Sequence, residues 1–431
     1  MSEAREGART LSAATTLAVV IAGSVIALVA PAQAGAVPTT AAGSAAVSAK
    51  AALRCGDTIT ADTKLHADLV NCPTTGLVIG ADNITVDLNG HTIDGDNALA
   101  DCPVDVNCDV GISNPAGHDG VTVRGGVIRQ FDTGVFFAGG PAHTRLRQLT
   151  VRNSLGVGIF VVDSTDTVIE KNDLSDSGFT GLVVGGSRHA QLTGNSVSRG
   201  AGSALFLFDV HDSTVEKNTL DHNNHGIVAV AGSSRVTIRR NAISHSNGSS
   251  IDLGENATAN RVEHNHLADN GDGIILEEVS DNLISGNLVT GTGFFGFPDT
   301  GGFGIILDGA DRNKLDRNTV TGGRGPAILV LTLDAPTASE DNLISRNIVN
   351  SRQSDGIYVG NTATATVVER NTANGSGNDG IHVDGPTTRL ARNLANNNHN
   401  LGIEAVPGVT DGGGNHASHN GNPAQCTNVA C

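Results

Sequence analysis

The sequence predicts an all-β protein wound as a single-stranded parallel β-helix, a solenoid of about 14 coils stacked on one another. Three observations predict this fold. A small residue followed by apolar–x–apolar recurs at a step of about 23 residues, and a column of asparagines recurs at the same step. Inside each unit the apolar residues alternate with a period of two, and no segment shows a competing helical period.

The N-terminus has the features of an export signal. Arg5 and Arg9 precede an apolar run from Leu17 to Ala30, which is too short to span a bilayer, and Pro31-Ala32-Gln33-Ala34 supplies a small-x-small cleavage site. We therefore expect a secreted protein with no membrane segment once the signal is removed. The expected domains are a signal peptide at 1–34, an Ala/Thr/Ser-rich linker at 35–53 and a β-helix domain at 54–431.

Six cysteines fit an exported chain, in which an even set is usually disulfide-bonded. None of their spacings resembles a zinc site. Fifteen pairings are open in principle, and sequential pairing is the simplest: Cys55 with Cys72, Cys102 with Cys108, and Cys426 with Cys431. These bonds would hold the two ends of the solenoid.

The charge balance excludes nucleic acid as a partner. The 431 residues include 27 Lys and Arg against 44 Asp and Glu, a net charge of −17, and the basic residues are scattered. A nucleic-acid-binding surface needs a concentrated positive patch.

The first column of the repeat places a small residue before each inner strand. It is clearest in eleven successive units, which begin at Gly158, Gly181, Ala204, Gly226, Ser250, Gly273, Gly304, Ala327, Gly356, Gly380 and Gly402. Gly76, Gly111 and Gly134 keep the same phase earlier in the chain. The regular step predicts that the Ile, Leu and Val residues of successive coils stack inward.

The second column consists of asparagines that each lie in apolar–x–x–Asn–x–apolar: Asn172, Asn195, Asn218, Asn241, Asn265, Asn287, Asn318, Asn347, Asn371 and Asn393. Coils stack about 4.8 Å apart, so each side-chain amide is expected to bond to the next one. Asparagine also tolerates the left-handed backbone of a sharp corner.

The segment from Gly76 to Gly95, with Ile84-Thr85-Val86-Asp87-Leu88-Asn89-Gly90, resembles the opening coil of secreted proteins of the pectin-lyase-like superfamily. The resemblance covers roughly residues 76–415 and implies a right-handed β-helix. The superfamily includes pectate lyases, polygalacturonases, alginate lyases and uronan C5-epimerases, along with copper-site accessory proteins and adhesins. Such a fold does not decide among these functions.

One motif points to proton abstraction. Asp209-Val210-His211-Asp212 resembles the Asp-Pro-His-Asp signature of alginate C5-epimerases, in which the His and an Asp flank the abstracted C5 proton. Val210 replaces the proline of that signature, and Phe206-Leu207-Phe208 replaces the preceding Tyr-Gly. The alternative interpretation is turn chemistry, because Asp163-Ser164-Thr165-Asp166 occupies the same phase.

A second candidate site is a group of carboxylates on three coils. Asp252 replaces an outward apolar residue, and Glu277 and Asp308 follow on the next coils, with Glu255 and Glu278 adjacent. Such clustering suits the acid/base pair of a hydrolase, or a Ca²⁺ ion as the one expected cofactor. The Gly-hinged insertion beside it contains Phe294, Phe295 and Phe297, which are candidates to cover a substrate. A solvated acidic face with an incidental loop is the alternative.

A column of apolar residues is expected to face away from the core: Phe136, Phe160, Val183, Phe206, Val228, Ile275, Ile306 and Leu329. Three explanations remain open: cover by insertions, a homo-oligomer interface, or a sugar-stacking face. Phe206 is a candidate for sugar contact. Tyr358 and His382, which lie on adjacent coils and also face outward, are further candidates for substrate binding, with Asp384 beside His382. The alternative is that these residues are merely exposed.

The preferred hypothesis is an exported carbohydrate-active enzyme acting on an extended, uronate-containing polysaccharide by β-elimination. Base candidates are His211 and Lys217, and the candidates that would handle carboxylate or metal are Asp209, Asp252, Glu277 and Asp308. Hydrolysis by Asp252, Glu277 and Asp308 is the next hypothesis. It is favoured because the negatively charged protein would repel a polyanionic substrate unless a metal ion were bound. Epimerisation comes third, and a non-catalytic adhesin-like or copper-accessory module is the alternative to an enzyme.

Overall fold

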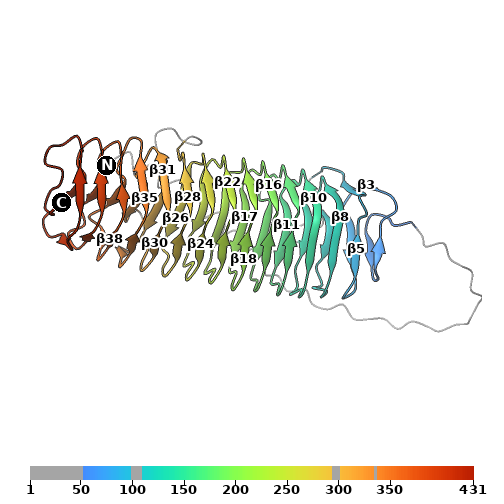
Figure 1. The fold of residues 1–431 in the computed structure, drawn as a ribbon. Helices are drawn as coiled ribbons and strands as arrows, with labels where there is room; N and C mark the ends of the chain where they lie inside the picture. The colour runs from blue at the N-terminus through green and yellow to red at the C-terminus, as the bar shows by residue number, and fades with distance from the viewer. Residues whose placement is uncertain (1–51, 99–108, 294–300, 334–336) are drawn as a thin grey trace, which may run out of the picture.

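The computed structural model describes residues 52–98, 109–293, 301–333 and 337–431, and in these segments all regular structure is β-strand. The expected parallel β-helix is confirmed, with one strand from each of fifteen coils in a continuous parallel sheet (Figure 1), here called the long sheet. Its strands are β1 (Asp57–Ile59), β4 (Thr75–Ile79), β7 (Val110–Asn114), β9 (Thr133–Phe137), β11 (Val157–Val162), β14 (Leu182–Gly185), β17 (Ser203–Phe208), β20 (His225–Val230), β23 (Ser249–Leu253), β26 (Asp272–Glu277), β29 (Ile305–Asp308), β32 (Ile328–Leu331), β36 (Ile357–Val359), β40 (Ile381–Val383) and β43 (Ile403–Ala405).

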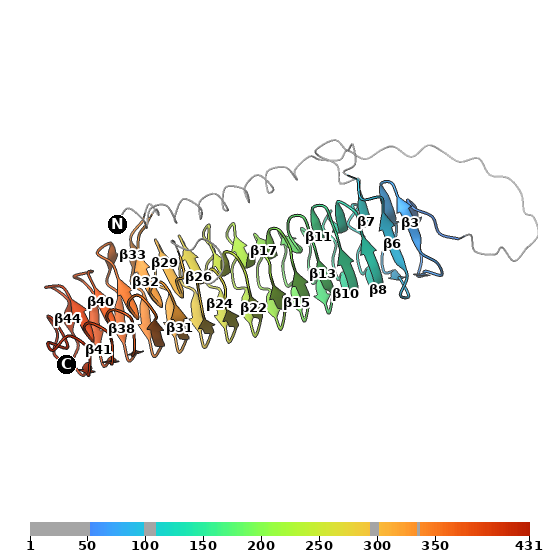
Figure 2. The same cartoon turned by 90° about the horizontal axis from the view of Figure 1, so that it is seen from above.

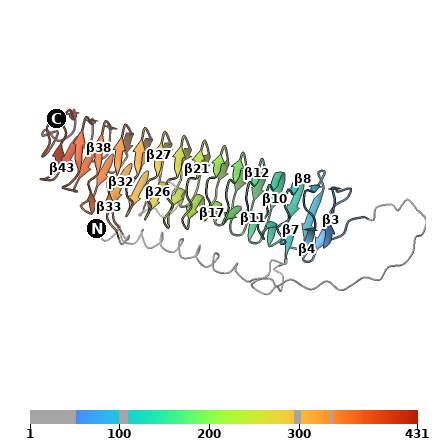
Figure 3. The same ribbon diagram turned by 90° about the horizontal axis from the view of Figure 1, so that it is seen from below.

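The other faces of the solenoid are formed by shorter strands, such as β21 (Thr237–Arg239) and β22 (Ala242–Ser244), which also pair in parallel with the coils before and after. Near the N-terminal end, the eight-residue strands β8 (Thr122–Arg129) and β10 (Arg145–Arg152) span two of these faces. Figure 2 shows β7, β11, β17, β26 and β40 following one another along the molecule. Figure 3 shows β12 (Val168–Glu170), β21 and β27 (Leu283–Ser285) in the same progression on another face.

The core is one continuous column of inward apolar side chains. It contains one inward residue after another from the long sheet, for example Ile159, Leu182, Leu205 and Ile227, all fully buried. Each is in register with the next. The small-residue column falls at the start of the long-sheet strands, either just before the strand or as its second residue. Its size requirement is also explained: a Cβ on Gly158 would lie 2.5 Å from the carbonyl oxygen of Gly181.

The asparagine ladder is confirmed and extends to Asn415. Asn218 illustrates the pattern: its Oδ1 accepts from the backbone N–H and the side-chain amide of Asn195 at 2.8 and 3.0 Å. Its Nδ2 donates to the Leu192 carbonyl at 2.9 Å and to Asn241 Oδ1 at 3.0 Å. Every hydrogen-bonding position of the amide is used, so a buried polar residue is stabilising here. A second ladder, which the sequence analysis did not identify, joins Asn260, Asn282, Asn313 and Asn342.

The left-handed corner, which the sequence analysis attributes to the ladder asparagines, falls one residue earlier. Lys171, Lys217 and Arg240 have φ angles of 54–56°, whereas the asparagines that follow them do not have positive φ. The reason is that the asparagine side chain must turn inward to reach its neighbour, while the preceding residue can bend the chain with its long side chain in solvent.

Two of the three expected disulfides are confirmed, Cys55–Cys72 and Cys426–Cys431, near the two ends of the solenoid. Cys102 and Cys108, the export signal at 1–34 and most of the linker lie outside the described residues. Within the described segments, nothing forms a helix long and apolar enough to cross a membrane.

Candidate active site

A single column of side chains runs along the outer face of the long sheet, and we call it the outer column. The strand register aligns its members from β7 to β43: Ser113, Phe136, Phe160, Val183, Phe206, Val228, Asp252, Ile275, Ile306, Leu329, Tyr358, His382 and Glu404. Most members are apolar. The polar members are Ser113 at the start of the column, Asp252, and the residues of the last three coils.

The apolar members form two clusters that are separate from the main core, one around Phe136 and Phe160 and one around Ile275, Ile306 and Leu329. Phe136 and Phe160 stack with ring centroids 5.6 Å apart. The expectation that these residues face away from the core is therefore confirmed. All of these residues except Phe206 and Val228 are buried, so most of the apolar column is covered. What covers it, and the alternatives of oligomer contact and sugar stacking, remain predictions.

The last three members of the outer column belong to a group of polar residues that we call the C-terminal polar cluster: Asp355, Tyr358, Asp379, His382, Asp384 and Glu404. Its centre is His382, which the β40 strand holds between Tyr358 on β36 and Glu404 on β43. His382 Nδ1 lies 3.6 Å from Asp379 and 3.8 Å from Glu404, and Nε2 lies 3.3 Å from Asp384.

Asp355 and Asp379 enter the cluster because of a local turn requirement. Each stands immediately before the glycine of its coil, and its Oδ1 accepts a backbone N–H of the next coil, from Asp379 at 2.9 Å and from Leu401 at 2.6 Å. Their Oδ2 atoms lie 3.7 and 3.6 Å from Nδ1 of His382. These two carboxyl groups thus hold the backbone with one oxygen and face the imidazole with the other.

The carboxyl groups of the cluster differ in burial, and the pKa values of the buried ones are raised. The Asp379 side chain is fully buried, and burial together with the neighbouring Glu404 and Asp355 raises its pKa to about 7. Burial raises the pKa of Asp355 as well. Asp384 and Glu404 keep 36% and 40% of their side-chain surface exposed, so these two are the carboxyl groups that a ligand can reach.

Tyr358 supplies a proton donor to the same cluster. Its hydroxyl donates to Asp384 Oδ2 at 2.8 Å, and its ring meets that of His382 edge-on with centroids 5.1 Å apart. Burial and the bond to Asp384 raise the pKa of Tyr358 to about 12. The phenol therefore stays protonated around neutral pH.

The cluster also has the donor set of a cation site. One atom each from Asp355, Asp379 and His382 lies within 4.8 Å of the others. Carboxylate oxygens suit Ca²⁺ or Mg²⁺, and a histidine nitrogen widens the choice to transition metals.

The right-handed beta helix region family model matches residues 133–289 and 269–399, more than half of the chain. The chain belongs to this family. None of the curated proteins compared with it matches significantly.

Among solved structures, this β-helix is similar to the A-module of a mannuronan C-5 epimerase from Azotobacter vinelandii, with 14% identity over 85% of this chain and 89% of that one and a TM-score of 0.44. A periplasmic alginate epimerase gives 13% identity over 70% and 77% of the two chains, with a TM-score of 0.41. A DFA-IIIase from Arthrobacter chlorophenolicus gives 15% identity over 58% and 71%, with a TM-score of 0.43. These similarities are too distant to assign a reaction.

The β-helix places the other carboxylate candidates on the same sheet, three to five coils before His382. Asp252 is in the outer column, and its pKa rises to about 7 because of burial and the nearby charges of Glu277, Asp272 and Glu255. Glu277 and Asp308 are in register on adjacent coils. The expected gathering of carboxylates is thus present, although Asp308 also accepts the Leu333 N–H at 2.8 Å.

The adjacent residues Glu255 and Glu278 lie at corners of the β-helix, with φ angles of 48° and 53°. Burial and the charge of Glu278 raise the pKa of Glu255. Phe294, Phe295 and Phe297 of the neighbouring insertion lie outside the described residues. Phe206 is in the outer column, 6.0 Å from Phe208 between ring centroids.

The epimerase-like motif occupies a turn of the β-helix. His211 Nε2 is 2.9 Å from Asp209, Nδ1 is 2.8 Å from Ser234 Oγ, and both Asp209 and Asp212 have φ angles of 51°. These values match the turn interpretation, although the His–Asp contact itself remains available for chemistry. Lys217 lies beyond β18 (Thr214–Glu216), where its Nζ is 3.4 Å from Glu216.

Sequence reasoning identified Tyr358, His382 and Asp384 but missed Asp355, Asp379 and Glu404. A signal for all three was present. Glu404 occupies the same place after Gly402 that His382 occupies after Gly380, and the two aspartates stand directly before the glycine of their coils. Counting backward as well as forward from the small-residue column would have found them.

Proposed function

We propose that the protein is an exported carbohydrate-active enzyme that cleaves an extended, uronate-containing polysaccharide by β-elimination at the C-terminal polar cluster. One observation carries this proposal: a protonated phenol, Tyr358, and an imidazole, His382, lie on adjacent coils of one outward column, and Asp384 contacts both. A proton donor and a base held side by side on a rigid sheet are the minimum that elimination requires.

In this reaction His382 takes the C5 proton of the uronate, the C4–O4 bond breaks as the C4=C5 bond forms, and Tyr358 gives its proton to the departing O4. Asp379 and Asp355 face the imidazole from the buried side and stabilise the imidazolium that forms. Asp384, between the two groups, lies where a proton can return from His382 to Tyr358. Each group is thus restored for the next cycle.

The acidity of the surroundings sets a condition on this reaction. A uronate carboxylate approaching Asp384 and Glu404 is repelled unless a cation accompanies it. These two exposed carboxylates offer the oxygen ligands that Ca²⁺ prefers. A bound Ca²⁺ would supply the positive charge that makes the C5 proton acidic.

The rest of the outer column gives the site its preference for long chains. Asp252 lies five coils from His382, a distance of about 24 Å at the spacing of parallel strands. Ca²⁺ held by Asp252 and Glu277 would bind a second uronate of the same chain there. Ile275, Ile306 and Leu329, which lie between the two acidic positions, are buried, so the chain would pass over the residues that cover them. Two acidic positions along one straight sheet favour an extended polymer over a small sugar.

Hydrolysis is the second candidate, and the excess of carboxyl groups favours it. Asp379, with its pKa near 7, together with the exposed Asp384 and Glu404, provides both protonated and ionised carboxyl groups close to one another. Glycoside hydrolysis uses such a combination, and a neutral polysaccharide would not be repelled.

Incubation of the purified protein with a panel of uronate and neutral polysaccharides, with and without Ca²⁺, tests the proposal. New ultraviolet absorbance from unsaturated uronates is expected for β-elimination. Reducing ends without that absorbance would overturn elimination in favour of hydrolysis. No product from any polymer would overturn the enzyme proposal and favour a non-catalytic binding module.

A further inference from the structure

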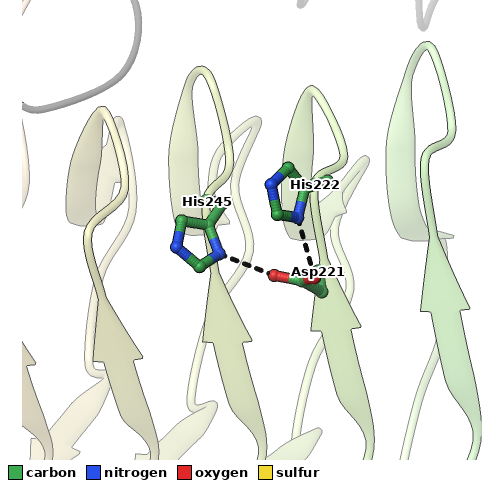
Figure 4. A group of neighbouring side chains, drawn as sticks. All are labelled: Asp221, His222 and His245. Atoms are coloured by element: carbon green, nitrogen blue, oxygen red, sulfur yellow. Dashed lines mark hydrogen bonds and ion pairs between the residues drawn. The ribbon is translucent and has the colours of Figure 1, made fainter.

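A second group of histidines and a carboxylate lies away from the long sheet, at a corner that follows β19 (Thr219–Asp221) and β22 (Figure 4). We call Asp221, His222 and His245 the histidine corner. Nδ1 of His222 lies 2.7 Å from Asp221 Oδ2, and Nδ1 of His245, one coil later, lies 2.8 Å from Asp221 Oδ1. Both imidazoles therefore direct the same nitrogen at one carboxylate.

The backbone brings these side chains together. Asp176, Arg199, His222 and His245 occupy the same corner on four successive coils, all with φ angles of 54–57°. At this corner the side chains of adjacent coils meet: Arg199 forms a two-pronged pair with Asp176 at 2.7 and 2.8 Å. His222 and His245 stack with ring centroids 4.5 Å apart.

The Asp221 carboxylate lies between the two rings, with one oxygen facing each imidazole. Ser244 Oγ lies 2.8 Å from Asp221 Oδ1 and supports the carboxylate from the next coil. The corner thus offers two imidazole nitrogens and one anionic oxygen, all within 4.8 Å of one another.

This donor set has a defined chemical preference. Two imidazoles and a carboxylate suit Zn²⁺, Cu²⁺, Ni²⁺ or Co²⁺, whereas Ca²⁺ and Mg²⁺ require mostly oxygen ligands. A tetrahedral ion with metal–nitrogen bonds of about 2.0–2.1 Å needs ligand nitrogens about 3.3 Å apart. The ligand atoms of the corner already lie within 4.8 Å of one another, so binding requires them to approach by at most about 1.5 Å.

The molecule contains a natural comparison. His143 and His189 also face one carboxylate, that of Asp166, at 3.5 and 3.3 Å. These two histidines lie on coils before and after the aspartate, so they are two coils apart, about 9.6 Å at the strand spacing. Among the described residues, Asp221, His222 and His245 bring one ligand atom each within 4.8 Å of one another, whereas Asp166, His143 and His189 are not such a group. Of these two cases, only the one with its histidines on adjacent coils has the ligand spacing of a cation site.

We propose that Asp221, His222 and His245 bind one divalent transition-metal ion of the Zn²⁺ class. The ion replaces the two N–H···O contacts with metal–ligand bonds and joins two successive coils. In a solenoid, stability depends on the interfaces between neighbouring repeats. Binding to the folded form alone therefore stabilises the middle of the molecule.

Calorimetric titration of the chelator-treated protein with Zn²⁺ tests this proposal, with His189→Ala as the matched control and His382→Asn to account for binding at the C-terminal polar cluster. We expect one equivalent of Zn²⁺ to bind at the histidine corner in wild type, His189→Ala and His382→Asn. His245→Ala and His222→Ala should lose this equivalent or bind it at least about tenfold more weakly. Ca²⁺ should not compete for it. Identical isotherms for wild type and both corner variants would overturn the proposal.

A spectroscopic measurement on the unaltered chain removes any dependence on how the variants fold. Electron paramagnetic resonance of the protein loaded with Cu²⁺ should show coupling to two imidazole nitrogens, and His189→Ala should give the same spectrum. A spectrum without imidazole coupling would contradict the site.

Discussion

The outer column differs sharply between two stretches of one sheet. Over β9 to β20 it consists of Phe136, Phe160, Val183, Phe206 and Val228, whereas over β36 to β43 it consists of Tyr358, His382 and Glu404. The register of the parallel ladder is continuous through both. Because the backbone is the same, the difference between an apolar packed stretch and a polar candidate site comes from the side chains alone. Substitutions in one stretch can therefore serve as controls for substitutions in the other.

The largest effect is expected for His382→Asn. Removing the base should lower turnover of a cleaved polysaccharide about 10²- to 10⁴-fold, the usual contribution of a positioned acid or base. Steady-state rates measure it. Asp209→Asn, which changes the turn motif around His211, should retain activity. If Asp209→Asn lost activity while His382→Asn remained active, the active site would be at the turn and not at the C-terminal polar cluster.

The next largest effect is expected for Tyr358→Phe. The ring and its contact with His382 remain, but the proton donor is lost, so kcat should fall about 100-fold while KM changes little. Comparing kcat and KM separates this from a binding role. A raised KM with an unchanged kcat would show that Tyr358 binds the sugar without donating a proton.

In the apolar stretch, Phe160→Ala should affect stability without affecting activity. Phe160 is 8% exposed and stacks on Phe136, so its truncation should lower the free energy of unfolding by about 3–5 kcal/mol. Denaturant titration measures this change. Tyr358→Phe is the matched control and should stay within about 1 kcal/mol of wild type. Equal losses for both would remove the distinction between the two stretches.

The smallest effect is a change in the pH profile. The pKa of Asp379 is raised from 3.8 to about 7 in the folded protein, so the folded state binds more protons than the unfolded chain between these values. The stability of the C-terminal coils should therefore fall as the pH rises through this window. Asp379→Asn keeps an oxygen for the Leu401 N–H but cannot ionise, so hydrogen exchange of these coils should depend less on pH. An unchanged pH dependence would contradict the assigned pKa.

The sequence was sufficient to predict the fold because each coil repeats the same requirements. The small residue at the start of each coil's long-sheet strand and Asn218 with its ladder neighbours recur in phase, so their roles could be inferred from position alone. The site was predicted only in part. Asp355 and Asp379 act through two oxygens with different partners, one on the backbone and one on His382, and a linear pattern does not show that division.

The histidine corner shows a second reason why sequence reasoning falls short. His222 and His245 are 23 residues apart, and their shared carboxylate becomes evident only when the coils are stacked in register. His143 and His189 also face one carboxylate, that of Asp166, but lie two coils apart. Adjacency of coils, a property of the fold, separates the two cases.

A crystal structure of the His382→Asn variant soaked with a uronate oligosaccharide tests the central claim most directly. The account predicts sugar density along the outer column, with one unit against Tyr358 and Glu404 and the chain running toward Asp252. Sugar bound on another face of the solenoid, or at the turn of His211, would contradict it.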